Sequence, residues 1–590
     1  AKINAQLSKI VSVGFNTRFI RSDYVQPTHL NESFFAEIGR QCWPTKPLYD
    51  PNGILYDDHV LQMQNGGEKQ ERNTWLYQQL NITVEPIKGW RLIGDLSYRY
   101  NTQYSHWDYL TVHQTGVDGK TKGNTWNNDS QVHEGTYASD YFNVNLYTDY
   151  AKTFAKSHNM KVLFGFQAEQ NNYKDIAAEK LGVIYPGKPT INTSTGMDSN
   201  NQKVAPNVAG GHNRWATAGF FGRLNYDYLE KYLLEVNLRY DGSSRFRSDS
   251  RWGFFPSFSA GYDIARTDYF KQWSLPVSQL KVRLSYGRLG NQNGAGLYDY
   301  LNFMTLRPDY SNAWLLSGVT SATPVRGTVA LTPSMVSPYI TWEKVDNANL
   351  GFDLTLLNNR LTITADIYQR TTKDMIGPAE AIPDIGGIAV DQRAKVNNAT
   401  LRNRGWELSV NWSDQLKNGF SYGIGFNIFD YKAVVTKYNN PEGLIYNNHT
   451  GLVRNKGYYQ GMDLGEIWGY EANDLFLTNQ EVDEYLRGVD MSFFKPNKDW
   501  QRGDLKYIDS NGDGKIDPGS GTLKDHGDLK IIGNTTPRYS FGLNLHAGYK
   551  GFEVSALFQG VMKRDFPMAA STYLFSGDSN FFKEHLDYYN

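Results

Sequence analysis

The chain has 590 residues, well beyond the size at which one compact core stops growing. Its 60 Lys and Arg residues nearly balance 61 Asp and Glu residues, for a formal net charge of -1. Nucleic-acid binding normally shows as a clear basic excess, so nucleic acid is not expected as a partner. A chain of this length is expected to form either several domains or one very large architecture.

Aromatic residues are abundant in a chain that is polar on average. There are 40 Tyr, 30 Phe and 14 Trp residues, while the mean hydropathy is -0.56. This combination suits alternating strands with rings at interfaces, in a membrane or in a large soluble β-protein. No run of the sequence approaches the ~18 consecutive apolar residues of a spanning helix. An all-β fold is therefore expected.

Segments in which apolar and polar residues alternate recur along the chain. They persist for about ten residues, the length that a tilted strand needs to cross a bilayer. The clearest segments, in chain order, are 92–100, 234–240, 280–286, 406–412 and 420–428. Their second face is small or charged, as a wet lumen requires. Strands of soluble sandwiches are usually shorter, so a membrane barrel of roughly sixteen strands is favoured.

The expected connections are of two very unequal kinds. Tight turns are predicted at 85–89, 228–231, 357–360, 414–419 and 549–551. Long polar loops are predicted at about 19–74, 102–135, 170–212, 291–338, 373–403 and 431–536. Loops of that length are unusual in compact soluble domains, whereas outer-membrane barrels have short periplasmic turns and long external loops.

Four long segments resemble the SusC/RagA group of TonB-dependent outer-membrane transporters of Bacteroidota. They occur in the order expected for that group, and the resemblance covers most of the chain from about residue 75 onward. The segments are Arg239–Phe246 with Arg251–Gly261, Ser285–Gln292, Trp342–Asp353 with its continuations Leu357–Leu361 and Tyr368–Asp374, and the Asp-rich loop that leads to Ile532–Asn534 and Phe558–Gly560.

The resemblance implies a large antiparallel transmembrane β-barrel, about 22-stranded in the group, in contact with outer-membrane lipid. It also implies TonB-driven import of oligosaccharides or peptides together with a SusD-like surface lipoprotein. Residues 1–590 are then expected to be a portion of the barrel, with the plug, the TonB-contacting segment and the last strands outside it. The alternative is a passive porin-like or structural outer-membrane barrel, which the alternation fits equally well.

One segment matches the start of an EF-hand-type loop. Carboxylate and amide oxygens fall at positions 1, 3, 5 and 9, a Gly stands at the sharp turn, and a backbone carbonyl is offered at position 7. Position 12, normally an acid, is Ser520, so Asp528 is expected to loop back in preference to Asp525. A structural calcium ion is therefore predicted at Asp509, Asn511, Asp513, Lys515, Asp517 and Asp528. The alternative is a metal-free loop of Asx turns.

The sequence gives no sign of an enzyme. Its 11 His residues form no His-Glu-x-x-His motif, and no Gly-x-Ser-x-Gly elbow is present. Asp57 and Asp58 are interpreted as solvated charges of a polar loop, in preference to a glycosidase pair. Aromatic residues of the long loops could stack on a ligand, but packing of the loops is favoured. These residues are Trp43, Trp107, Trp126, Tyr310, Trp314, Tyr458, Tyr459 and Trp468.

Overall fold

The computed structural model describes most of the chain in two compact units. The first unit contains Ala1–Thr148 and Gly165–Ala218, and the second contains Asp149–Phe164 and Gly219–Pro567. No helix among the described residues is both long and apolar enough to cross a membrane. The described residues are 1–31, 34–35, 38–39, 47–116, 118–120, 122–124, 129–273, 275–304, 306–307, 328–331, 333, 335–378, 394–445, 458–495, 499–566 and 583.

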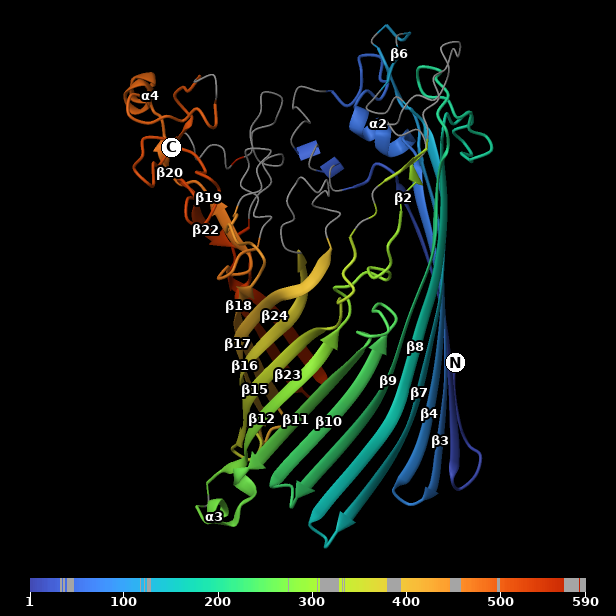
Figure 1. The fold of residues 1–590 in the computed structure, drawn as a ribbon, viewed down its shortest axis with the longest axis vertical. Helices are drawn as coiled ribbons and strands as arrows, with labels where there is room; N and C mark the ends of the chain where they lie inside the picture. Colours follow the sequence, from blue (N-terminus) through green and yellow to red (C-terminus); the bar gives the residue numbers. More distant parts are fainter. Residues whose placement is uncertain are drawn as a thin grey trace. The chain divides into compact units, whose positions relative to one another are not determined.

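Among the described residues, sixteen strands form one hydrogen-bonded sheet, in which they follow one another in chain order (Figure 1). The ladders within β1–β4, within β10–β18 and between β23 and β24 are antiparallel. The predicted number of strands is thus confirmed. The strands are β1 (Lys2–Gln6), β2 (Val11–Pro27), β3 (Glu68–Ile87), β4 (Trp90–Tyr109), β7 (Gln131–Phe154), β8 (His158–Leu181), β9 (Asn207–Tyr228), β10 (Tyr232–Ser243), β11 (Trp252–Asp263), β12 (Val277–Asn291), β15 (Glu343–Leu356), β16 (Leu361–Pro378), β17 (Lys395–Gln415), β18 (Ser421–Lys437), β23 (Arg538–Tyr549) and β24 (Phe552–Lys563).

The remaining elements are short and lie in the connections between those strands. In the first unit they are α2 (Asp58–Asn65) and the pair β5 (His113–Thr115) and β6 (Lys122–Asn124). In the second unit they are η1 (Ile264–Arg266), α3 (Asp268–Lys271), β13 (Leu306–Arg307), β14 (Val329–Ala330), β19 (Glu466–Gly469), β20 (Ala472–Leu475), α4 (Asn479–Leu486), β21 (Leu505–Tyr507) and β22 (Lys530–Asn534).

The two faces of the sheet differ in the way that the alternating sequence predicts. Directly opposed residues of neighbouring strands share a face. Leu284 opposes Leu350 on one face of β12 and β15, while Arg283 opposes Gly351 on the other. Leu284 is exposed although it is apolar, as expected of a side chain that faces lipid. One face is therefore apolar and the other polar.

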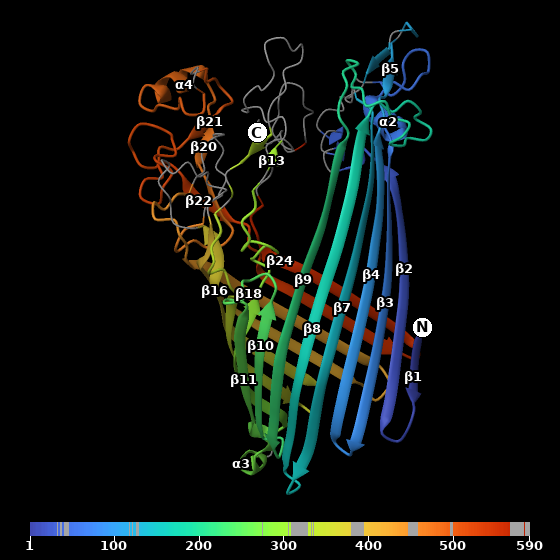
Figure 2. The same cartoon turned by 45° about the vertical axis from the view of Figure 1, so that its right-hand side comes forward.

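The predicted tight turns are confirmed. Leu229 and Glu230 join β9 to β10 with φ of 56° and 55°, the left-handed conformation that suits two-residue hairpins. Gly89, between β3 and β4, has a φ of 88°, and its N–H donates to Glu85 Oε1 at 2.9 Å. Within the first unit, the β1–β2 and β3–β4 turns lie at one end of the strands, and α2 and β5 lie at the other (Figure 2).

Most strands run farther than the sequence analysis expected, except β15, which begins at Glu343, beyond the end predicted for the 291–338 loop. The long connections occupy 28–67, 110–130, 182–206, 292–342, 379–394 and 438–537. The differences arise because strand ends were placed where apolar alternation stops. A ladder of backbone hydrogen bonds continues as long as polar side chains on neighbouring strands can pair, and β7 and β8 reach 24 residues each.

Buried apolar clusters lie at the ends of the second unit's strands and in its connections. One cluster contains Phe246, Phe255 and Trp342. Another packs Phe476, Val482, Met491 and Ile516 around α4, β20 and β21, which lie together in Figure 2. The 438–537 connection therefore contains a small core of its own.

Candidate functional site

The polar face of the second unit is organised around the guanidinium of Arg283 on β12. Its Nε and Nη2 donate to the two oxygens of Asp353 at 2.8 and 3.0 Å. Its Nη1 and Nη2 also donate to the two oxygens of Asp366 at 3.2 and 3.1 Å. The planar fork thus binds carboxylates on both β15 and β16 and joins three strands.

Gly351 makes this arrangement possible. It lies directly between Arg283 and Asp366 in the register of the three strands. A Cβ at this position would lie 2.6 Å from Arg283 Cζ and 2.5 Å from Asp366 Oδ1. Because real Cβ atoms do not approach so closely, a side chain here would displace the ion pair.

Further paired charges continue along the same unit. Arg288 and Lys373 both bind Asp346, with Arg288 Nε at 2.7 Å from Oδ1 and Lys373 Nζ at 2.9 Å from Oδ2. A cavity of about 700 Å³ lies where β7 to β12 begin or end at tight turns. Its charged lining residues are Lys152, Lys161, Asp227, Glu235, Lys281 and Arg283. The polar face is therefore charged, with the two signs interspersed.

Two of the segments that carry the family resemblance meet at the opposite ends of these strands. Trp342 packs against Phe246 and Phe255, with ring centroids 5.4 and 5.3 Å apart. Its indole Nε1 donates to the carbonyl of Arg251 at 2.8 Å. Only 6% of Trp342 is exposed. Residues from two of the four quoted segments thus form one buried cluster.

Hydrogen bonds extend this cluster to neighbouring strands. The buried carboxylate of Glu343 accepts from Asn291 Nδ2 at 2.6 Å and from the Ile376 N–H at 3.1 Å. The side chain of Asn397 on β17 accepts from the Thr341 N–H at 2.9 Å. The cluster therefore fixes the ends of β12, β15, β16 and β17 where their long connections begin.

The predicted calcium loop forms a tight turn around Asp509. Its Oδ1 accepts from the Gly512 N–H at 2.6 Å, and its Oδ2 accepts from the Gly514 N–H at 2.8 Å. Gly514 has a φ of 78°, as expected of the glycine at the sharp turn. Asn511 Oδ1 accepts from the Asp513 N–H at 3.0 Å, and Asp513 Oδ1 accepts from the Lys515 N–H at 2.8 Å.

The structure brings Asp528 back to this loop. Its two oxygens accept from the Ser510 N–H at 2.6 Å and from the Asp517 N–H at 2.9 Å, and the residue is 1% exposed. Asp525 instead accepts from the Ser520 N–H at 2.9 Å. Hydrogen bonds from the hydroxyl and N–H of Ser520 lower the pKa of Asp525. Asp528, and not Asp525, therefore lies against the loop that carries the other predicted ligands.

The chemistry of these donors fits a hard cation, because carboxylate, amide and carbonyl oxygens are calcium ligands. Their carboxylate oxygens are turned toward backbone N–H groups in the structure. Among the described residues, no three of these acids bring oxygens within 4.8 Å of one another. Metal binding would therefore require these side chains to exchange N–H partners for the ion, and the site stays a prediction.

Three other side chains do gather closely among the described residues. Asp57, Asp58 and His59 bring ligand atoms within 4.8 Å of one another at the start of α2. The sequence analysis interpreted Asp57 as a solvated charge, and for this residue the interpretation is wrong. Asp57 is buried, and its Oδ1 accepts from the Val60 N–H at 3.0 Å as the N-cap of the helix. A helix start inside a polar connection gave no clear sequence signal.

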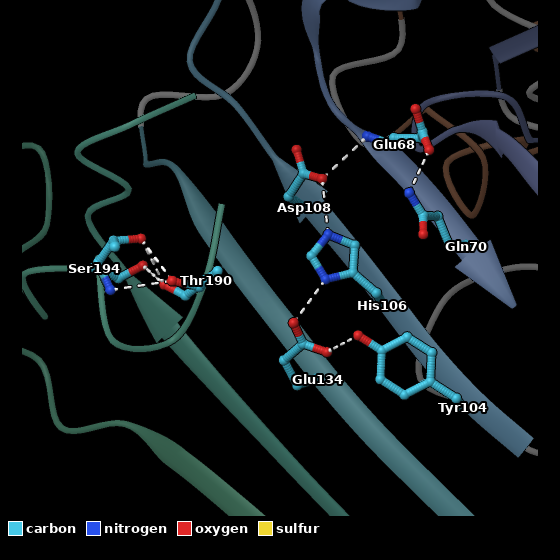
Figure 3. A network of polar contacts seen from close by, with 9 residues as sticks. Glu68, Gln70, Tyr104, His106, Asp108, Glu134, Thr190 and Ser194 are labelled. Carbon is cyan, nitrogen blue, oxygen red and sulfur yellow. Dashed lines mark hydrogen bonds and ion pairs between the residues drawn. The ribbon is translucent and has the colours of Figure 1, made fainter. Parts of the chain in front are cut away.

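A polar network joins three strands of the first unit, β3, β4 and β7, at the ends that lead into the long connections (Figure 3). The ring of His106 lies between two carboxylates, with Nδ1 at 2.9 Å from Glu134 Oε1 and Nε2 at 3.4 Å from Asp108 Oδ1. Tyr104 donates to Glu134 Oε2 at 2.7 Å, and the Glu68 N–H donates to Asp108 Oδ1 at 3.3 Å. The sequence analysis missed this network, although the alternation of Tyr104, His106 and Asp108 on one strand face was its available signal.

Three of the four described aromatic residues that the sequence analysis named pack within the protein. The rings of Trp107 and His133 stack with centroids 4.9 Å apart. Tyr459 and Trp468 are buried, and burial together with a hydrogen bond to Glu466 raises the pKa of Tyr459. Tyr458 is exposed. Trp43, Trp126, Tyr310 and Trp314 lie outside the described residues.

Comparison with known proteins identifies similar chains. The family model described as TonB dependent receptor-like, beta-barrel matches residues 12–557. TonB-dependent receptor P39 of Formosa agariphila is 26% identical over 94% of this chain and 52% of its own length. TonB-dependent receptor SusC of Bacteroides thetaiotaomicron is 30% identical over 57% of this chain and 30% of its own length.

A solved structure shares the fold. The RagAB peptide importer in its open-open state superposes with a TM-score of 0.71 at 18% identity, covering 95% of this chain and 56% of the importer chain. The chain thus spans about half the length of P39 and of the importer chain. The predicted all-β fold class and the predicted resemblance are both confirmed.

Replacing Arg283 by Gln should destabilise the protein, because two carboxylates would lose the fork that holds them together. We expect the free energy of unfolding of the full-length protein to fall by about 1–3 kcal/mol, measured by urea unfolding in lipid. Arg360→Gln is the matched control, since half of Arg360 is exposed and it makes one contact with Asp414; its effect should stay below about 1 kcal/mol. Equal effects would refute a special role for Arg283.

Replacing Trp342 by Ala should cost about 3–5 kcal/mol of unfolding free energy, because it opens a cavity in the buried cluster. Trp342→Phe keeps most of the volume but removes the shorter of two hydrogen bonds to the Arg251 carbonyl, which keeps the Ser243 N–H at 3.3 Å, so we expect a loss of about 1 kcal/mol. Trp273→Ala, at an exposed ring, should change stability by less than about 0.5 kcal/mol. A Trp342→Ala protein as stable as the Trp273→Ala control would contradict the packing described.

Proposed function

This chain belongs to the family of TonB-dependent receptor-like β-barrels of the outer membrane, and on that premise we propose that it walls an importer of oligosaccharides or peptides. Import would be driven by TonB and would use a surface lipoprotein of the SusD type as a lid. The observation that carries this proposal is the match of the family model to residues 12–557, almost the whole described wall. The family comprises receptors and transporters and not enzymes.

The polar face of the second unit supports passage of hydrophilic cargo. Its charges are paired across strands, as at Arg283 and Asp346, so that neither sign dominates. A wall of this kind stays hydrated without binding one sign of charge strongly. Both oligosaccharides and peptides are compatible with it.

Two comparisons favour a two-component importer. One relative is named SusC, and the RagAB structures are described as a peptide importer. The buried cluster of Phe246, Phe255 and Trp342 gives the long connections a rigid base from which they could contact a lipoprotein lid. A passive porin-like barrel is the second candidate, because a paired-charge wall would serve free diffusion as well.

The partner is tested by tagging the full-length protein, extracting it from cell envelopes in mild detergent and identifying what copurifies by mass spectrometry. We expect a lipoprotein of the SusD type in about 1:1 ratio, because ligand capture between barrel and lid requires a lasting contact. Recovery of the barrel without a lipoprotein would contradict the two-component importer. Steady conductance of the purified protein in planar bilayers would favour the porin-like alternative.

We also propose that the loop containing Asp509 holds a calcium ion that braces the 438–537 connection. The donor set of four carboxylates, one amide and one carbonyl supports it, as does the return of the buried Asp528. The ion would supply positive charge to acids that otherwise rely on backbone N–H groups. Its role would be structural.

Calorimetry on chelator-stripped full-length protein should detect one calcium ion bound with a dissociation constant below about 1 mM. Asp509→Asn should weaken binding by at least about tenfold, because the first ligand position loses its charge. Asp525→Asn is the matched control and should bind as the unchanged protein does, since Asp525 hydrogen-bonds to Ser520 instead. Absence of calcium binding below millimolar concentration would end the assignment.

A further inference from the structure

The helix α2, in the connection between β2 and β3, buries polar side chains where most helices bury apolar ones. Its buried residues are His59, Leu61 and Gln62. His59 is 3% exposed, and Gln62 is 1% exposed. The ring of His59 packs against the ring of Phe34, with centroids 6.0 Å apart. Because burial of a polar group is costly unless that group is bonded, packing alone does not account for two polar residues on this face.

The amide of Gln62 is buried and unsatisfied. Among the described residues, neither its Oε1 nor its Nε2 has a hydrogen-bond partner. Side chains of a helix lean toward its N-terminus and lie over the residues three and four positions earlier. For Gln62 these residues are His59 and Asp58. The unsatisfied amide is therefore directed toward the side chains at the start of α2.

The start of α2 places three ligand atoms close together. His59 Nδ1 lies 3.3 Å from Asp58 Oδ1 and 3.8 Å from Asp57 Oδ1. Within the described part of the chain, these residues form the one group of His, Cys, Asp and Glu whose ligand atoms all lie within 4.8 Å of one another. A tetrahedral zinc ion with bonds of about 2.0–2.1 Å holds its ligands roughly 3.3 Å apart. The three atoms are thus spaced much as ligands of one ion are.

The two carboxylates of this group are held in place and are not loose surface charges. The side chains of Asp57 and Asp58 are 7% and 18% exposed. Asp57 Oδ1 accepts from the Val60 N–H at 3.0 Å. At the other end of the helix, the Gly66 carbonyl accepts from the Leu110 N–H at 3.0 Å. Because α2 is fixed at both ends, its side chains are preorganised for a ligand.

We propose that Asp57, Asp58, His59 and Gln62 bind a divalent transition-metal ion of the Zn²⁺ type. The donor set combines an imidazole nitrogen with two carboxylates and an amide oxygen, and the imidazole distinguishes it from the oxygen sets that Ca²⁺ and Mg²⁺ prefer. A carboxylate has several lone pairs, so Asp57 keeps its bond to the helix N–H while it binds the ion. The ion fastens the first turn of α2 and gives the buried amide a partner. The site does not depend on the proposed import.

The test is calorimetric titration of the chelator-stripped full-length protein with Zn²⁺ in mild detergent. We expect a site with a dissociation constant below about 10 µM. His59→Gln should weaken binding at this site by at least about tenfold, because the nitrogen ligand is lost. His113→Gln is the matched control and should bind as the unchanged protein does, since it makes the same substitution at the exposed His113 of β5. Visible absorption of bound Co²⁺ should follow the same order.

Two further variants keep the shape of the site, even where His59→Gln fails to fold. Asp58→Asn and Gln62→Leu should each weaken Zn²⁺ binding by about fivefold or more, because each removes one ligand. Gln62→Leu should also leave the metal-free protein at least as stable, since it removes an unsatisfied amide. Equal Zn²⁺ affinity in the unchanged protein and in all three variants would overturn the proposal, as would absence of binding below about 10 µM. Displacement of Zn²⁺ by millimolar Ca²⁺ would identify a hard-cation site and overturn the assignment to a transition metal.

Discussion

The structure depends on one constraint: backbone N–H and C=O groups that cross hydrocarbon must bond to each other. A sheet meets this constraint only through ladders between neighbouring strands, and here the ladders join sixteen strands. The period of two then divides every strand between two environments. Leu284 and Arg283 are adjacent in sequence, yet they lie on opposite faces. Apolar contact with lipid and a polar wall are consequences of the same ladder.

Charges on the polar face are held by cross-strand geometry. Arg283 reaches two carboxylates on two further strands only because Gly351 has no side chain between them. At the other end of the strands, Trp342 and Glu343 join residues from several connections into a buried cluster. The buried contacts of Trp342 and Glu343 hold the strand ends in place where the long connections begin.

Much of this architecture could be read from the sequence. Alternation gave the strands, and the tight turns at 228–231 and 357–360 followed from short polar interruptions. Strand ends were less accessible, because polar pairs such as those around His106 continue a ladder after the apolar pattern has stopped. The return of Asp528 was predictable because position 12 of the predicted calcium loop lacks an acid. The capping role of Asp57 depends on α2, which has little sequence signature. The Arg283 network was missed because its three members are 70 and 83 residues apart in the chain.

The division of each strand between lipid and water is the central claim, and cysteine labelling along β12 tests it most directly. After replacement of the single cysteine, Cys42, one cysteine at a time would be placed in the full-length protein at 282, 283, 284, 285 and 286. Each variant would be treated with a membrane-restricted and with a water-restricted thiol reagent. Strict alternation is expected, with positions 282, 284 and 286 reacting from lipid and positions 283 and 285 reacting from water. Uniform labelling of all five positions by the aqueous reagent would contradict it.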